Sequence, residues 1–183
     1  MEDLVHNAPA LCLAAVLAAS PALSQSVVET AAGTMQIELV AEGLDEPWGI
    51  EFLPDGAFLV TERGGALKLF TGPGAEAVTV DGTPEVEVDG QGGLLDILIP
   101  RDFATSREVW LTYAEPRWAG AVTAVGRGVL SADGASLEGF ATVFAIPEGS
   151  SGGRHFGSRL VEAPDGTLFL TVGDRGTGPE GME

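Results

Sequence analysis

One hairpin pattern recurs along this chain, and it constrains the fold more than any other feature. An apolar segment runs into Pro-Asp-Gly and a second apolar segment leads away, at Pro54-Asp55-Gly56 and again at Pro164-Asp165-Gly166. Proline presets φ, aspartate bonds the backbone ahead of it, and glycine accepts a positive φ. Both sites therefore predict tight β-turns between strands. A looser copy of the pattern has its turn at Pro100.

The spacing of the hairpins predicts the fold class. The three prolines are separated by 46 and 64 residues, and apolar segments at 126–130 and 140–146 supply further strands. Short strands in four-strand units that repeat every ~40–50 residues are typical of a β-propeller. An immunoglobulin-like sandwich would not repeat the same hairpin at this spacing. We predict an all-β chain of about three blades, and hence the N-terminal portion of a longer propeller, which closes with four to eight blades.

The first residues are expected to be a signal peptide covering 1–24. An apolar run at 8–19 is too short to span a bilayer, and small residues at Ala22 and Ser24 suit a cleavage site. No lysine or arginine precedes the run, which is unusual for such a signal. A buried N-terminal helix is the alternative. Cleavage would leave a mature domain at 25–183 with no membrane span, and we expect it in a bacterial periplasm.

Cleavage would also simplify the chemistry of the chain. Cys12 and His6 would be removed, so the mature chain would contain no cysteine and a single histidine, His155. The full chain has 27 acidic and 9 basic residues and a net charge of −18. Such a surface repels polyanions, so nucleic acid is a poor partner. We interpret acidic residues such as Glu87 and Asp89 as a solvated face. The sequence has no cluster of histidine and cysteine residues of the kind that would suggest a metal site.

His155 and Asp174 flank the third hairpin, and they are the candidate catalytic residues. His155 precedes its first strand and Asp174 follows its second, so the turn brings both to one end of the sheet. A histidine oriented by a carboxylate can act as a general base. The glycines around them, at 152, 153, 157, 173 and 176, are expected to let a flat ligand approach the backbone. In the alternative interpretation, Asp174 only caps a turn and His155 has a structural role.

Three segments carry a resemblance to a known family. They are HFGSRLVEAPDGTLFLTVGDRG (155–176), GQGGLLDILIPRDF (90–103) and PWGIEFLPDGAFLVTERGGALKLF (47–70). Together and in this order they resemble the soluble glucose/sorbosone dehydrogenases that depend on pyrroloquinoline quinone (PQQ), which include the periplasmic aldose sugar dehydrogenases. The resemblance implies a six-bladed propeller that oxidises an aldose at its anomeric carbon to a lactone. It also implies an external electron acceptor.

The resemblance further implies roles for single residues. His155 matches the family's general base and Asp174 the carboxylate that orients it. Gln91 matches a glutamine that reaches the sugar or the quinone. Arg154 departs from the polar or acidic residue usual there, and we expect it to pair with a quinone carboxylate. The remaining cofactor contacts and the ligands of a calcium ion would lie beyond Glu183, so the chain by itself is expected to bind cofactor poorly and to be inactive.

Two other kinds of protein remain open on the sequence. A lactonase-type propeller would place a metal in the channel, ringed by acidic and asparagine side chains, but no asparagine follows Asn7. A propeller that only binds a partner or a sugar would need no histidine at its mouth. Arg63 and Arg159 are expected to donate hydrogen bonds between blades. Trp48, Trp110 and Trp118 are expected to pack between blades.

Overall fold

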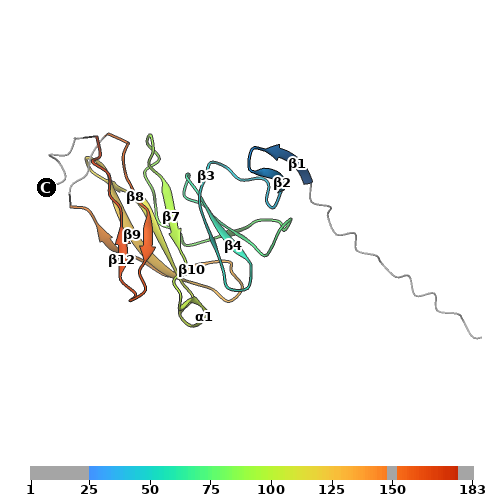
Figure 1. Cartoon of the computed structure of the whole chain (residues 1–183). Helices are drawn as coiled ribbons and strands as arrows, with labels where there is room; N and C mark the ends of the chain where they lie inside the picture. The colour runs from blue at the N-terminus through green and yellow to red at the C-terminus, as the bar shows by residue number, and fades with distance from the viewer. Residues whose placement is uncertain (1–24, 148–151, 177–183) are drawn as a thin grey trace, which may run out of the picture.

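The chain folds into consecutive antiparallel sheets, as Figure 1 shows in the computed structural model, which describes residues 25–147 and 152–176. The first four-stranded sheet contains β3 (Pro47–Phe52), β4 (Phe58–Glu62), β5 (Leu67–Phe70) and β6 (Val78–Val80), in that order. The second contains β7 (Leu94–Leu98), β8 (Glu108–Arg117), β9 (Gly120–Leu130) and β10 (Leu137–Ala145). A hairpin of β11 (Leu160–Glu162) and β12 (Leu168–Leu170) follows. Sheets that meander in this way are propeller blades, so the predicted fold class is confirmed.

The first strand of each sheet lies against the first strand of its neighbour. β3 and β11 each contact β7, and none of the three has a second partner within its own sheet. The main core lies between the first two sheets and includes Leu59 and Leu67 of the first sheet and Leu94, Leu111 and Tyr113 of the second. These side chains are almost fully buried. The core therefore joins the blades, and it sets the positions of the loops at the blade ends.

The turns between strands have the predicted conformation where Pro-Asp-Gly is present and depart from the prediction where it is not. Gly56 and Gly166 have φ of 89° and 84°, as expected for the final glycine of both turns. The looser copy at Pro100 instead contains a one-turn helix, α1 (Phe103–Ser106), which ends at Arg107 with φ of 54°. The buried ring of Phe103 anchors this helix to the core. The sequence had predicted a plain extended turn here.

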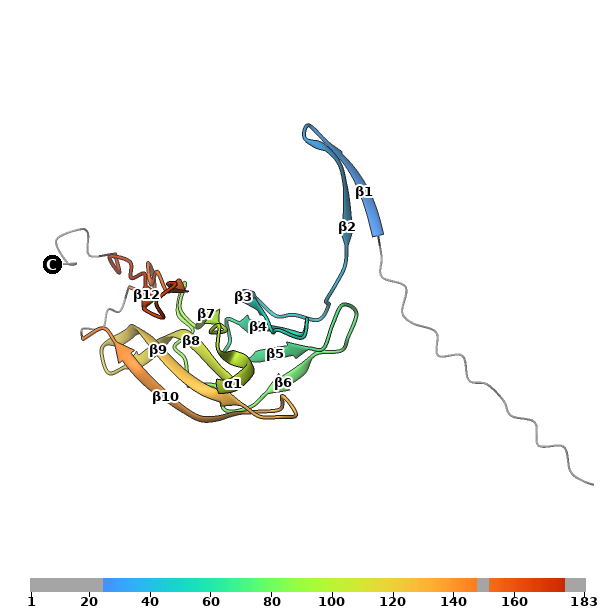
Figure 2. The same cartoon turned by 60° about the horizontal axis from the view of Figure 1, so that its bottom comes forward.

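The N-terminal hairpin stands apart from the blades. β1 (Gln25–Thr30) pairs with β2 (Gly33–Glu38), and Figure 2 shows both projecting away from the sheets. The alternating sequence of residues 35–41 is typical of a strand, and its first part lies in β2, which pairs with β1 only. Its side chains in β2 are exposed on both faces, so no burial ties the hairpin to the neighbouring sheet. The predicted signal peptide lies outside the described residues.

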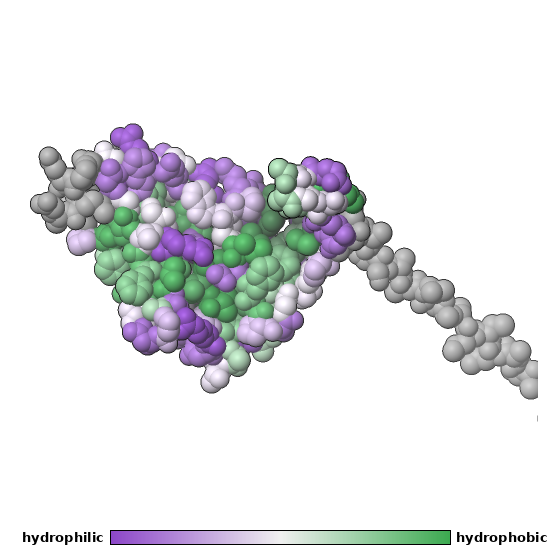
Figure 3. Space-filling view, in the orientation of Figure 1, coloured by the Kyte–Doolittle hydropathy of each residue, from purple (hydrophilic) through white to green (hydrophobic). Residues whose placement is uncertain are grey.

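A band of apolar side chains is exposed on the face seen in Figure 3, between polar surfaces above and below. Exposed apolar residues include Trp48, Ile50 and Phe52, which alternate along β3, and Phe144 of β10. Alternation of this kind gives one strand face to the core and the other to the surface. Extended apolar surfaces typically mark places where another sheet or protein packs.

The three tryptophans behave differently from one another. Trp110 packs between the second sheet and the β11–β12 hairpin, against a cluster that contains Leu98 and Leu160, as predicted. Trp48 is half exposed and Trp118 is fully exposed. The prediction of packing between blades is therefore wrong for these two in the described part of the chain.

Candidate functional site

His155 and Asp174 meet at the open end of the β11–β12 hairpin. The register pairs Leu160 with Leu170, so the residues before β11 and after β12 share one end of the hairpin. The Nδ1 atom of His155 lies 2.5 Å from Oδ1 of Asp174. A carboxylate at this distance accepts a proton from Nδ1, and in the neutral imidazole the lone pair is then on Nε2. The imidazole is about half exposed, so Nε2 can accept a proton from a ligand.

Gln91 holds the histidine from the neighbouring blade. Its side-chain Oε1 accepts a hydrogen bond from the backbone N–H of His155 at 2.8 Å, and its own backbone N–H donates to the carbonyl of Gly153 at 2.7 Å. Because a backbone N–H can only donate, the amide oxygen of Gln91 must face His155. The amide NH₂ is consequently available to donate to a ligand. The structure thus brings Gln91, His155 and Asp174 together.

The backbone of His155 is held in an unusual conformation. Its φ is 53°, in the left-handed region that few residues other than glycine adopt. Such conformations persist only where the surroundings enforce them, and they concentrate at functional sites. Here two hydrogen bonds hold the conformation, one from the backbone N–H of His155 to Gln91 and one between the imidazole and Asp174.

The glycines around the pair serve a different purpose from the one predicted. A Cβ on Gly173 would collide with the carbonyl of His155, and one on Gly157 would lie 2.6 Å from the carbonyl of Thr171. A Cβ on Gly153 would lie 2.5 Å from Oδ2 of Asp89, and one on Gly176 would collide with Arg154. These four glycines therefore allow the loops to pack against each other. The prediction that they open the backbone to a flat ligand is wrong at these positions.

Arg175 is the residue of this site that the sequence did not reveal. It is buried, its Nε donates to the carbonyl of Arg154 at 3.0 Å, and an NH2 nitrogen donates to the carbonyl of Ala121 at 3.3 Å. Its guanidinium carbon lies 3.5 Å from the ring centroid of Phe156. Arg175 thus contacts the residues on both sides of His155. Burial lowers the pKa of its guanidinium. Only its place after Asp174 in a glycine-bounded turn could have hinted at this position.

A buried carboxylate fixes the start of β11. Asp96 of β7 accepts hydrogen bonds from the backbone N–H of Leu160 at 2.8 Å and from Arg159 at 3.1 Å. Arg63 similarly donates to the carbonyls of Gly90 and Gly92 at 3.3 and 3.4 Å. The prediction that Arg63 and Arg159 link blades is therefore confirmed. The sequence feature that indicates the link to β11 is Asp96, a carboxylate inside the apolar segment of β7.

Arg154 lies at the surface beside the pair. Its side chain is exposed and passes next to Gly176, so the guanidinium lies at the edge of the site and does not contact the ring of His155 in any described interaction. An exposed guanidinium is suited to a carboxylate ligand.

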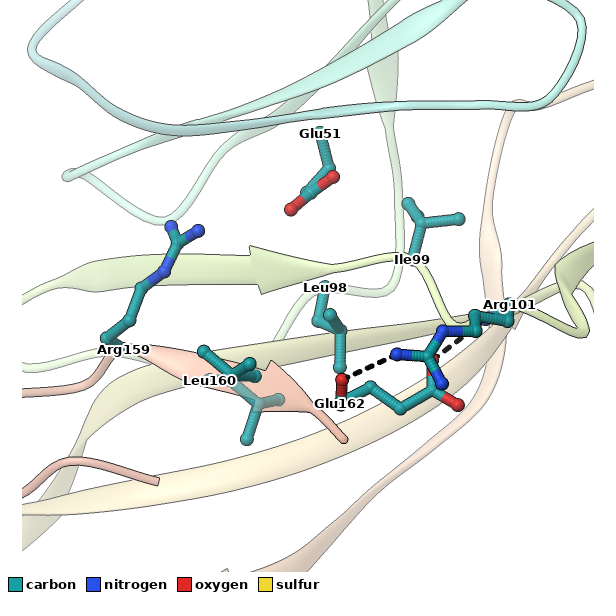
Figure 4. Close-up of a pocket in the computed structure, with 8 residues that line it drawn as sticks. Glu51, Leu98, Ile99, Arg101, Arg159, Leu160 and Glu162 are labelled. Carbon is teal, nitrogen blue, oxygen red and sulfur yellow. Dashed lines mark hydrogen bonds between the residues drawn. The ribbon is translucent and has the colours of Figure 1, made fainter. Parts of the chain in front are cut away.

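A separate cavity of about 240 Å³ lies between the blades and contains none of the four predicted residues. Figure 4 shows Glu51 of β3 facing Arg159 across it, while Arg101 bonds to the backbone of Glu162. Burial raises the pKa of Glu51, and the positive charge of Arg159 opposes part of that rise. The cavity lining includes Glu162, the last residue of β11, whereas His155 precedes the first residue of that strand. The cavity therefore lies along the strand, away from the histidine.

The sequence matches the model of the family described as Glucose / Sorbosone dehydrogenase over residues 44–182. The chain belongs to the glucose/sorbosone dehydrogenase family. It is 39% identical over 177 residues to the aldose sugar dehydrogenase YliI of Escherichia coli (strain K12), covering 96% of this chain and 45% of that protein. The resemblance inferred from the three sequence segments is confirmed.

Solved structures of this family also match. A glucose dehydrogenase has a TM-score of 0.73 at 39% identity over 87% of this chain and 46% of its own. The PQQ-bound aldose sugar dehydrogenase of Streptomyces coelicolor has a TM-score of 0.67 at 27% identity, covering 86% of this chain and 44% of its own. The chain thus spans about half the length of the family members it matches.

No helix in residues 25–147 and 152–176 is long and apolar enough to cross a membrane. The same residues contain no group of three or more histidine, cysteine, aspartate or glutamate side chains that could hold a metal ion.

Proposed function

We propose that the protein oxidises aldose sugars at the anomeric carbon to lactones, with PQQ as cofactor and His155 as general base. The observation that carries the proposal is the contact between Nδ1 of His155 and Asp174, which places the lone pair of a neutral imidazole on Nε2 in a half-exposed ring. The family relatives support the reaction class, since they are named as aldose sugar and glucose dehydrogenases. A PQQ-bound relative supports the cofactor.

The side chains at the mouth of the site fit part of a PQQ site. PQQ is a planar quinone with three carboxylates, and it needs hydrogen-bond donors and cations around its edge. Gln91 offers its amide NH₂, and the exposed guanidinium of Arg154 offers a partner for a carboxylate. When bound, PQQ supplies the two-electron acceptor that receives hydride from the sugar. For calcium the described residues offer no ligand cluster.

The residues of this chain would handle the proton. Nε2 of His155 accepts the proton of the anomeric hydroxyl as the C–H bond at that carbon breaks and a carbonyl forms. Asp174 keeps the proton of the imidazole on Nδ1 and stabilises the imidazolium that results. Gln91 fixes the backbone that carries the ring, so the direction of Nε2 is set before the substrate arrives.

Replacement of the pair tests the proposal. In the full-length protein loaded with PQQ, we expect His155→Ala to lower kcat for glucose by about 10²- to 10⁴-fold, measured with a dye as electron acceptor. Asp174→Asn should lower kcat by a similar order, because the asparagine can hold the wrong tautomer. Asp165→Asn is the matched control, since this carboxylate is in the same hairpin but at the opposite end.

The outcomes separate the alternatives. An unchanged kcat in His155→Ala would remove the general base from the proposal. A wild-type protein that binds PQQ or sugar without oxidising any aldose would instead indicate a propeller that only binds. We also propose export to a periplasm, where an external acceptor would reoxidise the cofactor. N-terminal sequencing of the exported protein would test it, with Gln25 as the expected first residue.

A further inference from the structure

Arg175 is a buried arginine in the turn that carries Asp174, next to the candidate pair. It is 7% exposed, and arginine side chains are rarely buried unless they are paired. Its φ of 53° equals that of His155, so both loops of the site contain a non-glycine residue in the left-handed region. Residues persist in this region where the surrounding structure enforces it. The contacts of Arg175 therefore bear on how the two loops fit together.

Arg175 holds the residues on both sides of His155. Its Nε donates a hydrogen bond to the carbonyl of Arg154 at 3.0 Å, and its guanidinium carbon lies 3.5 Å from the ring centroid of Phe156. A planar guanidinium can bond to a carbonyl through its edge and stack on an aromatic ring through its face. Because Asp174 and Arg175 are consecutive, these contacts set the separation between the imidazole of His155 and the carboxylate.

The same turn orients the carboxylate of Asp174. The backbone N–H of Gly176 donates to Oδ1 of Asp174 at 2.9 Å, and this oxygen lies 2.5 Å from Nδ1 of His155. Arg175 lies between Asp174 and Gly176 in the sequence, so its side-chain contacts fix the turn in which this bond forms. A displaced turn would move the carboxylate oxygen away from the imidazole.

Both loops are also attached to one strand of the preceding blade. The Nη2 nitrogen of Arg175 donates to the carbonyl of Ala121 at 3.3 Å, near the start of β9. The buried hydroxyl of Thr123, two residues further along β9, donates to the carbonyl of Phe156 at 2.9 Å. Strand β9 is therefore a common support for the loop before β11 and the turn after β12.

A second arginine makes the same kinds of contact far from the site. Arg107 has φ of 54°, its Nε donates to the carbonyl of Leu130 at 2.8 Å, and its Nη2 donates to the carbonyl of Ser131 at 2.6 Å. Its guanidinium carbon lies 5.5 Å from the ring centroid of Phe103. Arg107 bonds at the end of β9 and Arg175 at its start, which an extended strand of this length separates by roughly 30 Å. Arg107 therefore shows what such contacts contribute to folding alone.

We propose that Arg175 is a positioning residue for the base. It holds the loop of His155 against the turn of Asp174, so that the proton of the neutral imidazole stays on Nδ1 and Nε2 carries the lone pair. The inference rests on the proposed aldose oxidation and adds to it a residue that acts through the two neighbours of His155.

The first test separates kcat from KM in the full-length protein loaded with PQQ. For Arg175→Ala we expect kcat for glucose to fall about 10- to 100-fold while KM changes less than about threefold, because a displaced base impairs the chemical step. Arg175→Lys keeps the positive charge but lacks the planar fork of donors, so its kcat should fall about three- to tenfold. It also decides the question if Arg175→Ala does not fold.

Arg107→Ala and Arg107→Lys are the matched controls. They remove the same kinds of contact from the opposite end of β9. We expect them to lower the melting temperature about as much as the Arg175 variants do, with kcat within about twofold of wild type because the candidate pair is undisturbed.

A second readout does not depend on turnover. Imidazole ¹H–¹⁵N NMR spectra of the cofactor-free full-length protein, recorded at about pH 8, where a free imidazole is neutral, distinguish the two tautomers. The signal of His155, identified by its loss in His155→Gln, should show the proton on Nδ1 in wild type and in Arg107→Lys. In Arg175→Lys and Arg175→Ala a share of the proton should move to Nε2.

The outcomes distinguish this inference from the proposed reaction. An unchanged tautomer in both Arg175 variants, or an unchanged kcat in Arg175→Ala, would overturn the positioning role and leave glucose oxidation by the wild type in place. Equal losses of kcat in the Arg107 and Arg175 variants would also overturn it, since the effect would then follow stability alone. A tautomer change confined to the Arg175 variants, in a protein that oxidises no aldose, would support the hold on His155 and reject the oxidation.

Discussion

The hairpins β3–β4 and β11–β12 follow the same plan, 110 residues apart, yet only the second carries the candidate pair of His155 and Asp174. In the first, the N–H of Leu53 donates to the carbonyl of Ala57 at 2.8 Å and the N–H of Gly56 to the carbonyl of Leu53 at 3.0 Å. The second repeats both bonds at the corresponding positions with the same lengths. In each turn the aspartate, Asp55 or Asp165, accepts from the N–H two residues ahead.

The correspondence continues along the strands. Thr61 accepts a hydrogen bond from the N–H of Gly49 at 2.9 Å, and Thr171 accepts one from the N–H of Arg159 at 3.0 Å. A backbone hydrogen bond also closes the open end of each hairpin. In the first hairpin it runs from the N–H of Arg63 to the carbonyl of Glu46. Its counterpart runs from Gly173 to Phe156 in the second.

The two hairpins differ in the side chains at these open ends. In the first, Arg63 forms an ion pair with Glu46 and bonds to the backbone before β7. In the second, Gly173 has no side chain, so the backbone of His155 lies directly against it and the imidazole reaches Asp174. The two hairpins therefore share one backbone framework. The residues at the open end decide whether that end holds a structural link between blades or a candidate base.

The largest expected effect comes from filling the space at Gly173. Gly173→Ala would place a methyl group against the carbonyl of His155, and backbone cannot move aside cheaply. We expect a loss of stability of about 1–3 kcal/mol and a fall in kcat of at least about tenfold because the imidazole is displaced. Thermal unfolding and glucose oxidation measure the two.

Gly64→Ala, at the open end of the first hairpin, is the control for this substitution. Nothing lies within 4 Å of the position its methyl group would take. Both its stability and its kcat should stay close to wild type. Equal losses in the two variants would show that the ends of the two hairpins are packed alike, contrary to the structure.

A smaller effect is expected from the matching threonines. Thr61 is fully buried and also donates to the carbonyl of Leu95 in the next blade at 2.6 Å, whereas Thr171 is exposed. Thr61→Val should therefore cost about 1–3 kcal/mol, since it leaves buried backbone groups unpaired. Thr171→Val should cost less, about 0.5–1.5 kcal/mol. Denaturant unfolding of both variants checks the order, and a reversed order would contradict the burial difference.

The smallest effect concerns the turn aspartate of the second hairpin. Hydrogen bonds from Thr167 lower the pKa of Asp165, so the folded state favours its ionised form. The resulting stabilisation is present above the unfolded-state pKa, near about 3.9, and is lost as the pH falls through the lower folded-state pKa. The melting temperature of Asp165→Asn should lie slightly below wild type at pH 7 and converge with it near pH 2. A difference that persists at low pH would assign the effect to something other than ionisation.

Much of this arrangement could be predicted from the sequence because it depends on local patterns. Pro-Asp-Gly determines its own turn, and the turn determines that His155 and Asp174 share an end. The spacing of the hairpins predicted the propeller, and the family segments added Gln91. The hydrogen bond from the backbone N–H of His155 to Gln91 joins residues 64 positions apart, and no local pattern encodes it.

The misses have physical reasons. No role was predicted for Arg175, because only the three-dimensional packing of Phe156 and Ala121 around it shows that it is buried. Trp118 was assigned to packing by residue type alone, although a tryptophan at a hairpin tip has no neighbouring sheet to pack on. The glycines were predicted to leave room for a ligand. The sequence shows that they have no side chain, but it does not show that other parts of the protein fill the space beside them.

The bond between Gln91 and His155 also has a consequence for the order of assembly. The histidine and its carboxylate belong to one hairpin, but the glutamine that sets the backbone of the histidine belongs to the preceding blade. Each hairpin can form from local contacts, yet the imidazole takes its working orientation only once the two blades have docked. A half-assembled molecule would hold its base in the wrong place. Chemical competence would therefore arise late in folding, together with the completed interface between blades.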